Sequence, residues 1–228
     1  MTTTIVTSPG ALPAITRPST RLMLTAGVLA GPLFLVTILI QQATRAGVDP
    51  VTQPLSLLSL GENGWIQITN FIVSGLLVLA SAVGIRRTLR GGPAGTWGPI
   101  LIAVYGVALV WGGVFVADPA SGFPAGAAMG VPDPSTWSWH SWMHAFAAPA
   151  MGLSLIAACF VFARAFRRQG KTGWAVLSWA AAAGYFVVAG TGFGTSDFRL
   201  VLAGGGLLWL WAAAVSAHLL HMREKGSA

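Results

Sequence analysis

Residues 66–85 read IQITNFIVSGLLVLASAVGI, and the basic cluster RRTLR follows directly at residues 86–90. The stretch is 20 residues long and contains no Lys, Arg, Asp or Glu. A helix needs about 20 apolar residues to cross the hydrocarbon core of a bilayer, which is about 30 Å thick. The stretch therefore predicts a transmembrane helix, and the arginines after it mark the point where the helix leaves the membrane.

Five further runs share this length and lack of charge: Leu22–Ile40, Trp97–Ala117, Trp142–Ala163, Trp174–Phe193 and Leu200–Leu220. Charged residues make up 8% of the chain, against about 25% in an ordinary soluble domain. This composition excludes a soluble globular domain, a disordered chain, a coiled coil and a disulfide scaffold. Unbroken runs such as Leu76–Val83 lack the alternation of membrane β-barrels. We therefore expect an all-α polytopic membrane protein, a bundle of six transmembrane helices.

The positive charges predict how the chain is oriented. Of the 13 Lys and Arg residues, only Arg45 and Arg199 lie on one side of the predicted spans, together with five of the six acidic residues. Because cytoplasmic loops carry the excess of Lys and Arg, both termini should be cytoplasmic. We expect a flexible cytoplasmic tail over residues 1–20, a transmembrane domain over residues 21–221 and a cytoplasmic tail over residues 222–228. The predicted location is the inner (cytoplasmic) membrane of the cell, with several crossings of the bilayer.

The abundance of Arg invites comparison with nucleic-acid-binding proteins. Here, however, the cations occupy short loops at helix ends, where they act as topology signals and contact anionic lipids. We therefore expect membrane lipid as a partner and no nucleic acid. A homo-oligomer or a membrane protein partner is compatible with this sequence.

One face of the second predicted span is polar. Asn63, Gln67, Asn70, Ser74 and Ser81 are spaced 4, 3, 4 and 7 residues apart, which places them on one side of a helix. Lipid would leave these groups without hydrogen bonds, so the face should point into the bundle. It either forms interhelical hydrogen bonds or lines a polar cavity.

Two histidines open the fourth predicted span. His140 and His144 are four residues apart, so their rings lie on one helix face, a spacing that is able to place two imidazole nitrogens on one metal ion. Asp118, at the nearest predicted depth, is the first candidate for a third ligand, Glu62 and Asp197 are further candidates, and zinc is the candidate metal. The other interpretation is that the histidines donate hydrogen bonds to loops or titrate with pH.

Two features of the predicted outer loops stand out. Asp118 ends the third span, where a negative charge opposes the helix dipole, so we expect an ion pair with Arg199 or Arg45, or a ligand. The segment Leu55–Leu60 is too apolar for an ordinary solvated loop, and it predicts a short interfacial or re-entrant helix that ends at Gly61.

Residues 59–71, SLGENGWIQITNF, and residues 115–119, FVADP, resemble the signature of a known family, as does the position of His144. This is the bacterial six-span membrane family catalogued as domain of unknown function 998, and the resemblance covers roughly residues 24–220. It implies an integral membrane protein with outer-side positions at Gly64, Trp65, Gln67, Asn70, Asp118 and His144. It implies no mechanism, and it does not extend to His140 or Glu62.

These observations lead to one main hypothesis and two alternatives. The main hypothesis is a non-enzymatic membrane protein that binds a small ligand or lipid headgroup in an outward-facing polar pocket, lined by Asn63, Gln67, Asn70, Asp118 and His144. The first alternative is a metal-dependent membrane hydrolase for lipid or envelope substrates, with zinc held by His140, His144 and Asp118. The second is a small-solute transporter, although no acidic residue lies within a predicted span.

Overall fold

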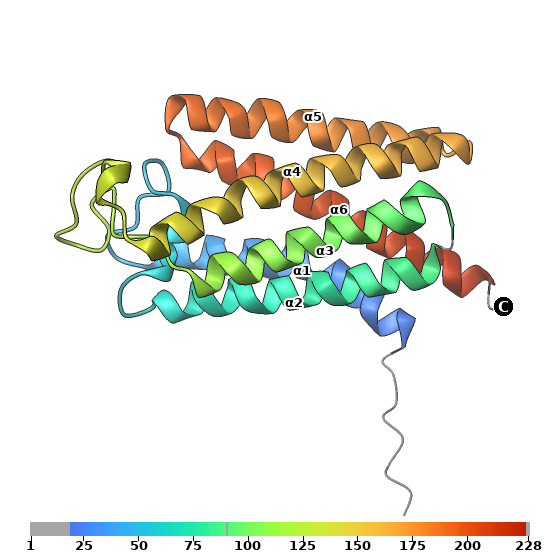
Figure 1. Cartoon of the computed structure of the whole chain (residues 1–228), viewed down its shortest axis with the longest axis horizontal. Coiled ribbons are helices and arrows are strands. Elements are labelled where there is room, and N and C mark those ends of the chain that lie inside the picture. Colours follow the sequence, from blue (N-terminus) through green and yellow to red (C-terminus); the bar gives the residue numbers. More distant parts are fainter. Residues whose placement is uncertain (1–18, 90, 227–228) are drawn as a thin grey trace, which may run out of the picture.

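The computed structural model describes residues 19–89 and 91–226, which form six long α-helices joined by loops (Figure 1). The helices are α1 (Thr20–Thr44), α2 (Gly64–Thr88), α3 (Gly92–Val114), α4 (Trp139–Arg168), α5 (Thr172–Thr195) and α6 (Phe198–Gly226). All six are long and apolar enough to cross a membrane, and the described residues form no β-strand. This confirms the predicted fold class, an all-α bundle of six membrane-spanning helices.

The helices close into a ring. Each helix packs against the next one in the chain, and α6 packs back against α1. Stacking of Phe34 on α1 against Trp209 on α6, with ring centroids 4.8 Å apart, is part of this closing contact. Figure 1 shows α4 and α5 together where residues 169–171 join them and further apart at their opposite ends.

The bundle has two different ends (Figure 1). Residues 45–63, 115–138 and 196–197 connect helices at one end, which we call the long-loop end. The other, the short-loop end, holds the α2–α3 connection, residues 169–171 and the last turn of α6. Most described cations lie at this short-loop end: Arg21, Arg86, Arg87, Arg164, Arg167, Arg168, Lys171, Arg223 and Lys225. The orientation of the two ends in a membrane stays a prediction, and Arg17, Arg90 and residues 1–18 of the predicted tail lie outside the described residues.

The helix limits differ from the predicted spans at both ends of α3. The helix begins at Gly92 rather than at Trp97, because Gly91 with φ of 80° turns the chain and a proline fits the first turn of a helix. It ends at Val114 rather than at Ala117, because Phe115 is extended. The sequence FVADP is therefore not helical, and α6 continues to Gly226, into the segment predicted to be a tail.

Glycines allow the helices of the ring to approach closely. A Cβ atom on Gly75 of α2 would lie 2.7 Å from the carbonyl oxygen of Gly106 on α3. A Cβ atom on Gly27 of α1 would lie 2.2 Å from Ser81 Oγ and 2.5 Å from Ser216 Oγ. Small residues at such crossings let helix backbones come together in membranes, where there is no hydrophobic effect to drive association.

A short 3₁₀ helix, η1 (Leu55–Ser59), lies in the first long loop, at the place where the sequence predicts a short helix. Leu57, Leu58 and Ser59 are buried, and η1 packs against α1 and α2. A Cβ atom on Gly64 would lie 2.2 Å from the carbonyl oxygen of Ser59, so only glycine fits at this first position of α2. The apolar character of η1 therefore reflects its packing against the bundle.

Candidate functional site

The polar face of α2 is buried from Gln67 to Ser81, as its spacing predicts, and it forms hydrogen bonds with α1. Gln41 Nε2 donates to Gln67 Oε1 over 2.8 Å. Asn70 Nδ2 donates to Gln67 Oε1 over 3.3 Å and to the carbonyl oxygen of Phe34 over 3.1 Å, and Ser74 donates to Asn70. Gln67 is completely buried, and its Nε2 has no partner in the described part of the chain. These groups are thus committed largely to joining two helices.

Arg45 connects this polar cluster to η1. Its guanidinium donates to Gln41 Oε1 and to the carbonyl oxygens of Leu58 and Leu60, and it lies 5.3 Å from the ring centroid of Phe123. Partial burial lowers the pKa of Arg45 below its ordinary value, because removal from water disfavours the charged form. Neither Arg45 nor Gln41 was predicted to be a site residue, although their i, i+4 spacing is a signal for such a contact.

A cavity of about 210 Å³ occupies the centre of the ring on its long-loop side. All six helices and η1 contribute to it, and most of its wall is aromatic or aliphatic. Its polar side chains are few, and the principal ones are Ser56, Tyr105, His144 and Tyr185. We call it the central cavity. A mostly apolar cavity with a few polar groups is the usual character of a small-molecule site.

A second cavity, of about 130 Å³, lies among the long loops. Asp118, Trp137, Ser141 and His144 line it, and we call it the loop cavity. Three residues line both cavities: Pro54, Ser56 and His144. The two cavities therefore adjoin, with the imidazole of His144 at the junction.

The ring of His144 is held in one orientation by α3. Its Nδ1 lies 2.7 Å from the carbonyl oxygen of Phe115 and 3.1 Å from that of Gly112. Since a carbonyl oxygen only accepts hydrogen bonds, Nδ1 carries the hydrogen atom. In the neutral ring, Nε2 is then a hydrogen-bond acceptor on the edge away from these carbonyls. His144 can thus present one acceptor at the junction of the two cavities.

The predicted ion pair of Asp118 with Arg199 or Arg45 is wrong. The carboxylate of Asp118 instead accepts hydrogen bonds from the backbone N–H and the hydroxyl of Ser138, over 2.7 Å and 2.6 Å. Arg199 pairs with Asp197 at 2.7 Å, and the partners of Arg45 are carbonyl oxygens and Gln41. Asp118 therefore fixes the start of α4, where Ser138 in turn caps the helix through Ser141.

The three candidate metal ligands are not gathered. His140 is exposed, with its ring 3.8 Å from that of Trp139, whereas His144 faces the end of α3 and Asp118 binds Ser138. Within residues 19–89 and 91–226, no group of three or more His, Cys, Asp or Glu is close enough to hold a metal ion. Zinc binding stays a prediction of the sequence.

The five candidate pocket residues fall into three places. Gln67 and Asn70 lie in the polar cluster between α1 and α2, and Asp118 and His144 line the loop cavity. Asn63 is exposed and lines a third cavity, of about 640 Å³, at the long-loop ends of α1 and α2. The central cavity includes His144 alone among the five.

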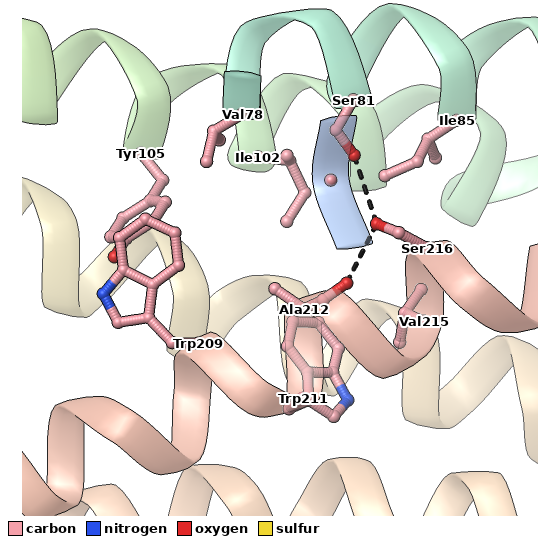
Figure 2. A pocket seen from close by; sticks show the side chains of 11 residues that line it. Val78, Ser81, Ile85, Ile102, Tyr105, Trp209, Trp211, Ala212, Val215 and Ser216 are labelled. Carbon is pink, nitrogen blue, oxygen red and sulfur yellow. Dashed lines mark hydrogen bonds between the residues drawn. The ribbon is translucent and has the colours of Figure 1, made fainter. Parts of the chain in front are cut away.

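A fourth, much smaller void lies between α1, α2, α3 and α6, and Figure 2 shows its lining. Ser216 donates to the carbonyl oxygen of Ala212 over 2.9 Å, so the 3.2 Å contact between Ser81 and Ser216 is a bond that Ser81 donates. The void measures about 10 Å³. That is at most the size of one water molecule, so it belongs to helix packing and binds no larger ligand.

Neither the curated proteins nor the solved structures contain a match to this chain. A match to a family does exist, and it extends over residues 28–218, from the first helix to the last. That range includes every lining residue of the central cavity, the loop cavity and the third cavity. The chain belongs to this family, which carries the description "Protein of unknown function (DUF998)".

Proposed function

We propose that this multi-pass membrane protein binds an amphiphilic ligand, with the apolar part of the ligand in the central cavity and its polar head in the loop cavity. The observation that carries the proposal is the junction: Pro54, Ser56 and His144 line both cavities. A single molecule that fills both cavities must be apolar at one end and polar at the other. The role is non-enzymatic in this proposal.

The polar groups at the junction specify the chemistry of the head. With Nδ1 bonded to the carbonyl oxygens of Gly112 and Phe115, Nε2 of His144 is available as a hydrogen-bond acceptor, and Asp118 adds a carboxylate to the wall of the loop cavity. A head that donates hydrogen bonds, such as a hydroxyl or an amine, satisfies both groups. An anionic head would meet the charge of Asp118 at close range, which is unfavourable.

The distribution of cations supports an orientation for this site. Most described cations lie at the short-loop end, which by the positive-inside rule is cytoplasmic. Both termini are then inside, the long-loop end faces outwards from the bacterial inner membrane, and the loop cavity opens to the outside. Membrane lipid is the partner that this arrangement requires.

A cavity-filling substitution tests the proposal. Gly205 lines the central cavity, and a Cβ atom there would meet no heavy atom within 4 Å, so Gly205→Leu places a side chain into the cavity without a clash at its first atom. Gly190 on α5 has equally open surroundings but is exposed and does not line the cavity, so Gly190→Leu is the matched control.

The measurement is mass spectrometry of the small molecules that remain bound to protein purified in mild detergent. We expect one amphiphile to accompany the wild type and the Gly190→Leu variant, and to be lost from the Gly205→Leu variant. Retention of the same molecule at the wild-type level by a folded Gly205→Leu variant would overturn the proposal.

A further inference from the structure

A separate crevice lies where α1 ends and α2 begins. It measures about 640 Å³, and it shares no lining residue with the central cavity or the loop cavity. Its wall combines charged, polar and apolar side chains, including Arg45, Glu62, Asn63, Gln41, Ile40 and Ile66. We call it the α1–α2 crevice. It therefore offers a second place for a ligand, independent of the one proposed above.

The crevice contains one positive and one negative side chain that do not pair with each other. Within residues 19–89 and 91–226, the hydrogen-bond partners of Arg45 are Gln41 and two carbonyl oxygens, and no Asp or Glu oxygen forms a salt bridge with it. Glu62 is exposed and has no hydrogen-bond partner among the described residues. Two opposite charges thus line one cavity and remain available to a ligand.

The guanidinium of Arg45 has N–H groups that form no hydrogen bond within the described residues. A guanidinium carries five N–H groups, and three of them donate to Gln41, Leu58 and Leu60. The remaining two are free to donate to an anion, and the bonds that are formed hold the guanidinium in place. Phosphate is the anion that suits a fixed guanidinium, because its oxygens accept two parallel N–H bonds.

An apolar strip leads away from the crevice along α1. Leu33, Val36 and Ile40 are 42%, 52% and 57% exposed and are spaced three and four residues apart, so they lie on one helix face. Ile40 also lines the crevice, and at about 1.5 Å per residue the strip extends about 10 Å towards the middle of α1. Because α1 is a membrane-spanning helix, this strip contacts lipid chains.

We propose that the α1–α2 crevice binds the phosphoethanolamine headgroup of a membrane phospholipid. Arg45 donates hydrogen bonds to the phosphate, Glu62 accepts from the ammonium group, and an acyl chain lies over Val36 and Ile40. Phosphatidylglycerol supplies the phosphate but no ammonium for Glu62, and the quaternary ammonium of phosphatidylcholine has no N–H to donate. The pair of opposite charges therefore selects the zwitterion with N–H donors.

The test compares three phospholipids with identical acyl chains. Delipidated protein in detergent is titrated with phosphatidylethanolamine, phosphatidylglycerol or phosphatidylcholine, and bound lipid is counted by native mass spectrometry. For the wild type we expect phosphatidylethanolamine to bind about fivefold more tightly than phosphatidylglycerol, the upper range for one exposed charge pair. Equal binding of the two lipids would overturn the proposal.

Glu62→Lys supplies the sharper test, because it exchanges the charge without removing a contact that holds the fold. We expect this variant to prefer phosphatidylglycerol over phosphatidylethanolamine, since both crevice charges are then positive. Asp133→Lys is the matched control: it makes the same change in net charge at the long-loop end, outside the crevice, and should keep the wild-type preference. A wild-type preference in Glu62→Lys would overturn the assignment of Glu62.

Two further measurements distinguish this proposal from a soluble ligand in the crevice and from the amphiphile site of the central cavity. Glycerophosphoethanolamine, which has the headgroup but no acyl chains, should not displace the lipid at equal concentration; equal competition would contradict a membrane lipid as the occupant. Glu62→Lys should retain the amphiphile of the central cavity, and Gly205→Leu should retain the preference for phosphatidylethanolamine. Each proposal can therefore fail while the other stands.

Discussion

Gln41 on α1 donates a hydrogen bond to Gln67 on α2 over 2.8 Å, and neither side chain is more than 3% exposed. This bond joins two neighbouring helices of the ring, and it is almost completely buried. It is also the central link of a chain of bonds that runs from Arg45 to Ser74.

Removal of either carboxamide should destabilise the protein. We expect Gln41→Ala and Gln67→Ala each to lower the free energy of unfolding by about 1–2 kcal/mol, because each removes the shortest hydrogen bond of this buried cluster. The double variant should show a coupling energy of about 0.6 kcal/mol, the average for interhelical hydrogen bonds in membranes. The measurement is reversible unfolding in mixed micelles, with Asn63→Ala, at an exposed position, as the control. Strict additivity of the two changes would mean that the bond itself contributes nothing.

The two nitrogen atoms of His144 should have separable roles. In His144→Asn the amide N–H can replace Nδ1 as the donor to the α3 carbonyls, whereas His144→Phe has no donor. We expect the Phe variant to be less stable than the Asn variant by about 1 kcal/mol. Both variants lack the Nε2 acceptor, so both should bind the amphiphile about twofold to tenfold more weakly, the range for one hydrogen bond. Wild-type affinity in both variants would show that Nε2 does not contact the ligand.

Metal content distinguishes the binding protein from the metal-dependent hydrolase. Because His140, His144 and Asp118 have different partners, we expect zinc in purified protein to be far below one equivalent per chain and unchanged by His140→Ala or His144→Ala. The measurement is elemental mass spectrometry on protein purified without a metal-binding tag. Near one equivalent of zinc, lost in both variants, would instead favour the hydrolase.

Impermeant thiol reagents can determine the orientation. The chain has a single cysteine, Cys159, which is buried, so the wild type should give only background labelling of intact cells. Ser135→Cys at the long-loop end should react from outside, and Gln169→Cys at the short-loop end should react only after the cells are opened. The reverse pattern would invert the proposed topology and place the loop cavity in the cytoplasm.

The sequence predicts those features that depend on one helix at a time. The lengths of the apolar runs are set by the thickness of a bilayer, so all six helices were foreseen. The burial of Gln67 and Asn70 follows from helical spacing and from the cost of unsatisfied amides in lipid. The limits of a helix are predicted less well: α3 ends at Val114 although the next residue, Phe115, is as apolar as those before it, and α6 continues to Gly226.

The sequence does not show which loop residues meet which helix. Asn63 and Gln67 are one turn apart, yet the first lines an exposed crevice and the second is enclosed by α1 and α2. The carboxylate of Asp118 accepts hydrogen bonds from Ser138, which lies at the other end of a long loop. A loop has no periodic pattern of residues from which such a contact could be predicted. In the sequence Arg45 is a single cation with no acidic residue directly beside it. In the structure its guanidinium donates to the carbonyl oxygens of Leu58, in η1, and Leu60, directly after η1. Candidate residues at one predicted depth therefore need not share one pocket.

The closure of α6 on α1 has a consequence for biosynthesis. Helices emerge from the ribosome in chain order, so the helix that completes the ring is the last to be inserted. Until then, Phe34 has no Trp209 to stack on, Ser81 has no Ser216 to bind, and the α6 side of the central cavity is missing. In a nascent chain that stops after α5, the ring is open, and the surfaces of α1 and α5 that pack against α6 have no partner. The ligand site proposed here therefore forms only after α6 has been synthesised and inserted.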